Sequence, residues 1–166
     1  MSSVVWFWII VAGATAFALG NIKYPLAREA EKKRAMTSMA VSLLQPELEA
    51  NLELVKRTKR LLSEDPPQVA LQSFNTAAWE TVSSSELLLG LDSEKLSRLM
   101  RAYHLVKQAN HLHGWMEENT LGISSVVKGE ARGKNKEALV KGLSENLDKL
   151  EPLLLTSIQD VQGEGE

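Results

Sequence analysis

Apolar residues open the chain in one block, and further on they recur every three or four positions. Residues 1 to 22 carry no charged side chain, and Val4 to Gly20 is apolar almost throughout. A helix rises about 1.5 Å per residue, so about 20 residues cross the ~30 Å hydrocarbon core of a bilayer. Val4 to Ile22 is just long enough, which predicts a single transmembrane helix.

The residues that flank this block predict its orientation. Met1-Ser2-Ser3 offers only the α-amino group, whereas basic side chains follow the block closely: Lys23, Arg28, Lys32, Lys33 and Arg34. The positive-inside rule then places the N-terminus outside a plasma or bacterial inner membrane and the C-terminal domain in the cytoplasm. Anionic lipid is expected near Arg28–Arg34. The residues expected at the membrane interfaces are Trp6, Trp8, Lys23 and Tyr24.

The apolar block also contains small residues at helical spacing. Ala12, Ala16 and Gly20 lie four positions apart and resemble a seam at which a second membrane helix packs. Their small size is alternatively only tolerated there. A cleaved signal peptide is the competing interpretation, since Ala16-Phe17-Ala18 fits a cleavage pattern. The chain lacks the basic residues that precede the apolar core of a signal peptide, so we expect an uncleaved anchor.

Apolar spacing predicts three long helices after the anchor. The first begins near Pro25 and runs toward Leu44, where Pro46 either kinks it or starts a new helix at Gln45. Asp65-Pro66-Pro67 ends this region. The second runs from Ser93 to about Asn119 with Asp92 as its cap, and the third runs from about Asn135 to Val161 with a bend at Pro152. The third helix has the most regular apolar stripe: Val140, Leu143, Leu147, Leu150, Leu154, Ile158 and Val161.

The stretches between these helices are less regular. Residues 68–90 read as two short helical pieces closed by Gly90, with a capping box from Ser83 to Glu86. Trp79 in this stretch is expected in the core, with a surface anchor for a partner as the alternative. Lys128 to Lys136 reads as a linker or exposed turn because it holds two glycines and no large apolar residue.

These elements together predict an all-α fold. A single N-terminal transmembrane helix is followed by an antiparallel helical bundle. The expected organisation is an anchor over residues 1–23, a cytoplasmic helical domain over residues 24–162 and a polar tail over residues 163–166.

Composition and charge add little chemistry to this picture. The chain has 19 basic and 21 acidic side chains, so nothing indicates a nucleic-acid partner. It has no cysteine, no glycine-rich phosphate loop and no nucleophile elbow. The histidines are the remaining candidates, and the weak metal-ligand set is His104, His111, His113 and Glu117. Single histidines on an amphipathic helix are more often surface or packing residues, so we expect no metal, no cofactor and no catalytic residue.

The middle of the chain carries a family resemblance. Leu48-Glu49-Ala50-Asn51-Leu52 is followed by Phe74-Asn75-Thr76-Ala77-Ala78-Trp79-Glu80, then by Ser84-Ser85-Glu86-Leu87, Tyr103 and Asn110. This order resembles a loose group of uncharacterised prokaryotic single-pass membrane proteins whose helical domain contains an Ala-Trp-Glu segment. The resemblance implies an anchor and a helical domain and carries no activity. It suggests that Asn51, Trp79, Tyr103 and Asn110 form one buried polar-aromatic junction.

These observations favour a non-enzymatic function. The expected one is a single-pass accessory or scaffold subunit that packs against other integral membrane subunits of a respiratory, photosynthetic, transport or secretion complex. Trp79, Tyr103 and Trp115 are the expected partner or core anchors. One alternative is self-association through a coiled coil formed by the last helix. The other is a metal-binding or enzymatic bundle built around His104 and His111.

Overall fold

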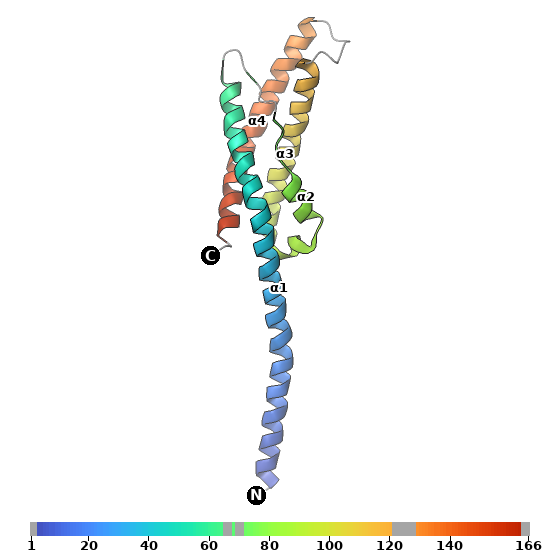
Figure 1. Cartoon of the computed structure of the whole chain (residues 1–166), viewed down its shortest axis with the longest axis vertical. Helices are drawn as coiled ribbons and strands as arrows, with labels where there is room; N and C mark the ends of the chain where they lie inside the picture. The colour runs from blue at the N-terminus through green and yellow to red at the C-terminus, as the bar shows by residue number, and fades with distance from the viewer. Residues whose placement is uncertain (1–2, 65–67, 69–71, 121–128, 164–166) are drawn as a thin grey trace.

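A computed structural model of the chain is all-helical over the residues that it describes (Figure 1). It describes the backbone of residues 3–64, 68, 72–120 and 129–163, and the side chains of residues 26–64, 68, 72–117 and 136–163. The elements, in chain order, are α1 (Ser3–Leu62), α2 (Ala77–Ser83), the 3-10 helix η1 (Glu86–Gly90), α3 (Ser93–Thr120) and α4 (Gly129–Gln162).

Helix α1 is one continuous element of 60 residues. The predicted helix start near Pro25 was wrong, and so was the alternative of a new helix at Gln45, because Pro25 and Pro46 both lie inside α1. The alternative of a kink at Pro46 stays a prediction. A proline within a helix loses one backbone hydrogen bond. Near Pro46 the completely buried Leu44 and Leu48 continue the same apolar stripe, and their packing holds the helix together across the loss.

The three long helices form a bundle in which two run the same way. Helices α1 and α3 run upward in Figure 1, and α4 returns downward and packs against both. The predicted stripe of α4 faces this interior: Val140 is half-buried, and the other members are buried, namely Leu143, Leu147, Leu150, Leu154, Ile158 and Val161. Pro152 lies within α4 on its exposed side and does not end the helix. The stripe is therefore covered by helices of the same chain.

Two charged side chains tie α4 to its neighbours at the rim of the bundle. Lys59 Nζ of α1 lies 2.8 Å from Asp148 and 2.7 Å from Glu151, and these hydrogen bonds raise the pKa of Lys59. Arg98 of α3 donates to Asp160 from Nε at 2.6 Å and from Nη2 at 3.2 Å, so the ion pair is bidentate.

The prediction of a linker over Lys128 to Lys136 was wrong, because α4 begins at Gly129. Each glycine costs a helix about 1 kcal/mol relative to alanine. Glu130, Ala131, Arg132 and Lys134 favour helix, so two glycines do not suffice to stop it.

The start of α3 agrees with the prediction. Asp92 Oδ1 accepts hydrogen bonds from the backbone N–H groups of Glu94 at 3.0 Å and Lys95 at 2.9 Å. These are the unpaired donors of a first helical turn. The bond from Lys95 is the main reason that the pKa of Asp92 lies below its ordinary value.

The segment between α2 and α3 lies close against α1. Two short helical pieces closed by Gly90 are present as predicted, but the cap of η1 is Ser85, whose Oγ accepts from Leu87 N, and not Ser83. A Cβ atom at Gly90 would lie 2.6 Å from the backbone nitrogen of Thr37, so only glycine allows this approach. Thr37 Oγ1 donates to the Gly90 carbonyl at 2.7 Å and fixes the contact.

The predicted transmembrane segment stays a prediction. Within the part of the chain open to this test, no helix combines the length and the apolar character needed to cross a membrane. The side chains of Val4 to Ile22 lie outside the described residues. The same holds for the residues predicted at the membrane interfaces and at the packing seam: Trp6, Trp8, Lys23, Tyr24, Ala12, Ala16 and Gly20.

Candidate functional site

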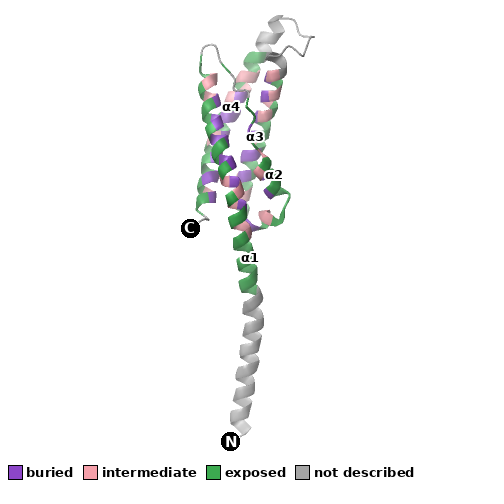
Figure 2. Cartoon of the chain, viewed as in Figure 1, coloured by how far each residue is buried: buried purple, intermediate pink, exposed green. Residues whose placement is uncertain are grey.

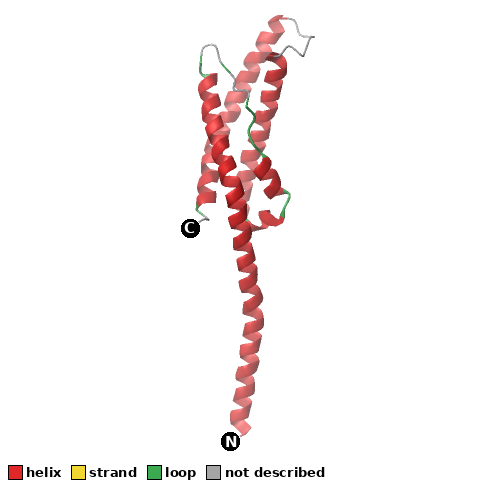
Figure 3. Cartoon of the chain, viewed as in Figure 1, coloured by secondary structure: helices red, strands yellow, loops and turns green. Residues whose placement is uncertain are grey.

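An irregular segment, residues 72–76, runs between α1 and α3 and leads into α2; we call it the strap (Figure 3). In an extended chain the N–H and C=O of one residue point to one side, and those of the next residue point to the other. Phe74 presents both groups to α3, and Asn75 presents both to α1. The strap therefore has polar backbone groups facing each helix.

Two asparagines, one on each helix, bind these backbone groups. Asn110 of α3 accepts from Phe74 N–H at 2.7 Å and donates to the Phe74 carbonyl at 2.9 Å. Asn51 of α1 accepts from Asn75 N–H at 2.8 Å and donates to the Asn75 carbonyl at 2.8 Å. A side-chain amide has one acceptor and one donor group, so each asparagine pairs with the strap as a neighbouring strand would.

A buried glutamate holds the start of α2, directly after the strap. Glu47 of α1 is 5% exposed and accepts three hydrogen bonds. Its Oε2 accepts from Ala78 N–H at 2.7 Å, and its Oε1 accepts from Trp79 N–H at 3.1 Å and from the Tyr103 hydroxyl at 2.7 Å. The first N–H groups of a helix lack partners within it, and Thr76 makes no side-chain cap at this end of α2. Glu47 therefore caps α2 from a different helix.

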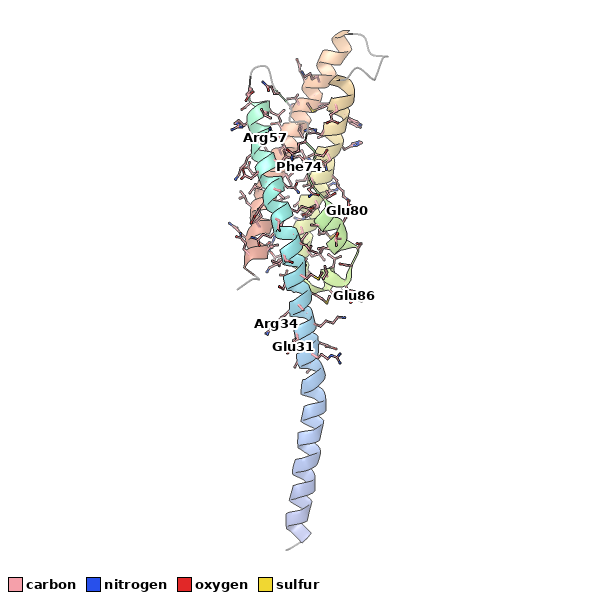
Figure 4. The ribbon with its side chains drawn as sticks, viewed as in Figure 1. Glu31, Arg34, Arg57, Phe74, Glu80 and Glu86 are labelled. Atoms are coloured by element: carbon pink, nitrogen blue, oxygen red, sulfur yellow. The ribbon has the colours of Figure 1, made fainter. Side chains whose placement is uncertain are left out.

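Two aromatic rings cover this carboxylate. The rings of Trp79 and Tyr103 stack with centroids 4.8 Å apart and planes 10° apart. Burial raises the pKa of Tyr103 above its ordinary value, and the hydrogen bond to Glu47 acts in the same direction. Tyr103 thus remains a neutral donor to the carboxylate. Phe74, on the strap, is 3% exposed and lies between the helices in Figure 4.

The structure brings together the four residues that the sequence suggested for one junction. Asn51 and Asn110 bind the strap, and Trp79 and Tyr103 stack on each other and bind Glu47 where the strap leads into α2. Asn110 is only half-buried. Sequence reasoning missed Glu47. The sequence did carry a sign of its role. Glu47 lies three positions after Leu44 and four before Asn51, which places it on the buried face of α1. A charged residue on such a face needs buried partners. We call these five residues the junction.

The histidines are not brought together in a metal centre. His104 is exposed and lies 3.0 Å from Gln108 Nε2, and the His111 ring lies 4.5 Å from the Trp115 ring. His113 is 2% exposed, and burial lowers its pKa more than the charge of Glu117 raises it. No three histidine, cysteine or acidic residues among the described side chains are placed to share a metal ion.

The three predicted anchors divide into two kinds. Trp79 and Tyr103 belong to the core, with exposed fractions of 9% and 1%. Trp115 is 47% exposed near the far end of α3. His111, next to it, lines a groove between α3 and α4 with Leu105, Leu112, Gly142 and Asn146. Only Trp115 of the three has a ring that a partner can reach.

The arrangement at the junction positions backbone rather than reacting groups. All three hydrogen bonds of Glu47 join it to groups of the same chain, and the asparagines bind the strap on both sides. The junction therefore sets how α1 and α3 lie beside each other. Comparisons of the chain with protein-family models, with curated protein sequences and with solved structures give no match. The resemblance to single-pass prokaryotic proteins stays a prediction.

Proposed function

We propose that this chain is a single-pass accessory or scaffold subunit of a larger membrane complex. Its first 22 residues anchor it in the bilayer, and the helical bundle packs on the cytoplasmic face of the complex. The function is non-enzymatic: the bundle acts by being held beside its partners.

The continuity of α1 is the observation that carries this proposal. The uncharged segment and the bundle belong to a single helix, Ser3–Leu62. An apolar block of about 20 residues matches the hydrocarbon thickness of a bilayer. Figure 1 shows the same helix leaving the bundle and extending well beyond it. A helix that ran so far into water without a partner would gain no stability from packing.

Charge and residue size suggest how the anchor is placed. Five basic residues lie within the twelve positions that follow the uncharged block, which favours a cytoplasmic bundle. Lys23 and Arg28 stand closest to the inner leaflet, where anionic headgroups attract them. Ala12, Ala16 and Gly20 would let a helix of another membrane subunit approach closely.

The alternative of self-association through the last helix is less favoured. The stripe that motivated it is buried against α1 and α3 of the same chain. A coiled coil between copies along this stripe would first have to open the bundle, and it would lose the apolar burial that the stripe already has.

Membrane extraction and native electrophoresis test the proposal. The full chain, expressed in its native host, should resist carbonate extraction, float with vesicles and migrate in mild detergent within a species much larger than one chain. A matched variant, Ala12→Ile, Ala16→Ile and Gly20→Ile, should still float but should leave the large species, because branched side chains block close helix contact. A chain that stays in the aqueous fraction, or that floats but runs as a small monomer, would contradict the proposal.

A further inference from the structure

The described residues of α1 between the predicted anchor and the bundle are exposed on every side. All residues of this part, 26–35, are exposed, and we call it the stem (Figure 2). Glu31 and Arg34 project from it in Figure 4. A surface ion pair joins the stem to the bundle: Lys32 Nζ lies 3.2 Å from Glu86 Oε2, and both side chains are about two-thirds exposed or more. Packing begins only above the stem, where Gly90 meets Thr37.

We propose that α1 is a rigid stalk that holds the whole bundle clear of the lipid surface; the inference rests on the proposed membrane anchor. Thr37 follows Ile22 by 15 residues, which at about 1.5 Å per residue is roughly 22 Å of helix. The headgroup layer on one side of a bilayer is only about 5–8 Å thick. The near end of the bundle therefore stands roughly 15 Å above the headgroups.

The continuity of the helix prevents the bundle from folding down. Because anchor, stem and bundle share α1, the bundle tilts only as far as the anchor tilts. Membrane helices tilt by about 0–40°, which shortens the height by at most about a quarter. Only a break in the stem would bring the bundle onto the lipid.

The stalk also makes the attraction to anionic lipid weaken from one basic residue to the next along α1. Arg28 lies about 9 Å of helix above Ile22, within reach of the headgroups through its long side chain. Arg34 lies about 18 Å above Ile22, where attraction to anionic lipid is largely screened. The gap beneath the bundle leaves the stem open to a membrane-bound partner from all directions.

Fluorescence quenching can measure this height, because the chain has no cysteine and single labels are specific. Leu26→Cys, Met39→Cys and Arg57→Cys place labels about 6, 26 and 52 Å of helix above Ile22. The full chain is reconstituted in phosphatidylcholine–phosphatidylglycerol vesicles that carry a quencher on the headgroups. Quenching should be strong at position 26, weak at 39 and absent at 57.

Two stem variants separate rigidity from charge. In E29G/A30G/E31G the stem becomes a flexible linker, so quenching at 39 should rise at least about twofold and quenching at 57 should become detectable. In E29A/E31A the same charges are lost but the helix is kept, and quenching should stay as in the unmodified chain. Circular dichroism checks that the bundle stays folded in both.

The outcomes distinguish the stalk from the anchor. A chain that floats with vesicles but is quenched equally at 26, 39 and 57 has its bundle on the lipid, and the stalk is wrong. A glycine variant with unchanged quenching also overturns it, because something other than the helix then sets the height. A chain that neither floats nor is quenched at any position removes the anchor itself, and with it the proposed function.

Discussion

The bundle joins its helices in two different ways. Helix α4 meets α1 and α3 through a continuous apolar stripe, which we call the direct interface, whereas α1 and α3 are joined through the strap and the hydrogen bond from Tyr103 to Glu47. At the junction each polar group named above has a partner. In the direct interface the buried hydroxyls of Thr58 and Ser157 have none among the described residues. Apolar packing is non-directional and tolerates such groups, but a strap held by hydrogen bonds requires each donor to meet its acceptor.

The largest effect should come from removing the aromatic cover of the junction. Trp79→Ala leaves a cavity beside Tyr103 and should lower the free energy of unfolding by about 3–5 kcal/mol. Leu147→Ala in the direct interface should cost about 2–5 kcal/mol. Both are measured by denaturant unfolding of the full chain in detergent. The matched control, Trp115→Ala, should cost under about 1 kcal/mol because this ring is half exposed. A neutral Trp79→Ala would mean that the Trp79 ring and its stack on Tyr103 add nothing to the stability of the core.

The next effect concerns the carboxylate that caps α2. Glu47→Gln replaces one acceptor oxygen by an NH₂ group that faces donors, and it should cost about 2–3 kcal/mol. Glu49→Gln, on the exposed side of the same turn, keeps one oxygen that can accept from Gln45 and should be close to neutral. Amide hydrogen exchange should rise at Ala78 and Trp79 in the first variant and not in the second. Equal exchange in both would show that water, rather than Glu47, satisfies these amides.

The two interfaces also differ in how far the sequence predicts them. Apolar spacing identified the stripe of α4, and the residue type before α3 identified the cap at Asp92, since both follow from local rules. Apolar spacing did not identify the continuity of α1, because the local penalty of proline is outweighed by packing that comes from distant segments. The resemblance suggested Asn51 and Asn110 for one junction, but apolar spacing did not predict that they pair with the backbone of the strap. This pairing joins residues 24 and 36 positions apart, and no periodicity encodes such contacts.

A smaller effect should follow from removing either asparagine of the strap. Asn51→Ala and Asn110→Ala should each cost about 1–2 kcal/mol, because each leaves one backbone N–H and one C=O of the strap unpaired. Hydrogen exchange should rise at Asn75 in the first variant and at Phe74 in the second. The double variant should lower the free energy of unfolding by less than the sum of the two single variants, by about 0.5 kcal/mol or more. The reason is that a strap released from one helix is also held less firmly by the other helix. Strict additivity would show that the strap does not couple α1 to α3.

The smallest effect is a pH dependence from His113. Burial lowers its pKa in the folded state, whereas the unfolded chain keeps the ordinary value of about 6.5. As pH falls below about 6.5, His113 binds a proton in the unfolded state but not in the folded state. The folded state therefore loses stability, by at most about 1.4 kcal/mol per pH unit, until the pH reaches the pKa of His113 in the folded state. His113→Phe should therefore lose less stability than the unmodified chain between pH 7.5 and 5.5 in denaturant unfolding. His111→Phe, at an exposed position, should follow the unmodified chain. If His113→Phe and His111→Phe show the same pH dependence of stability, His113 is already hydrated in the folded bundle. The far end of α3 is then more open than the 2% exposure of His113 indicates.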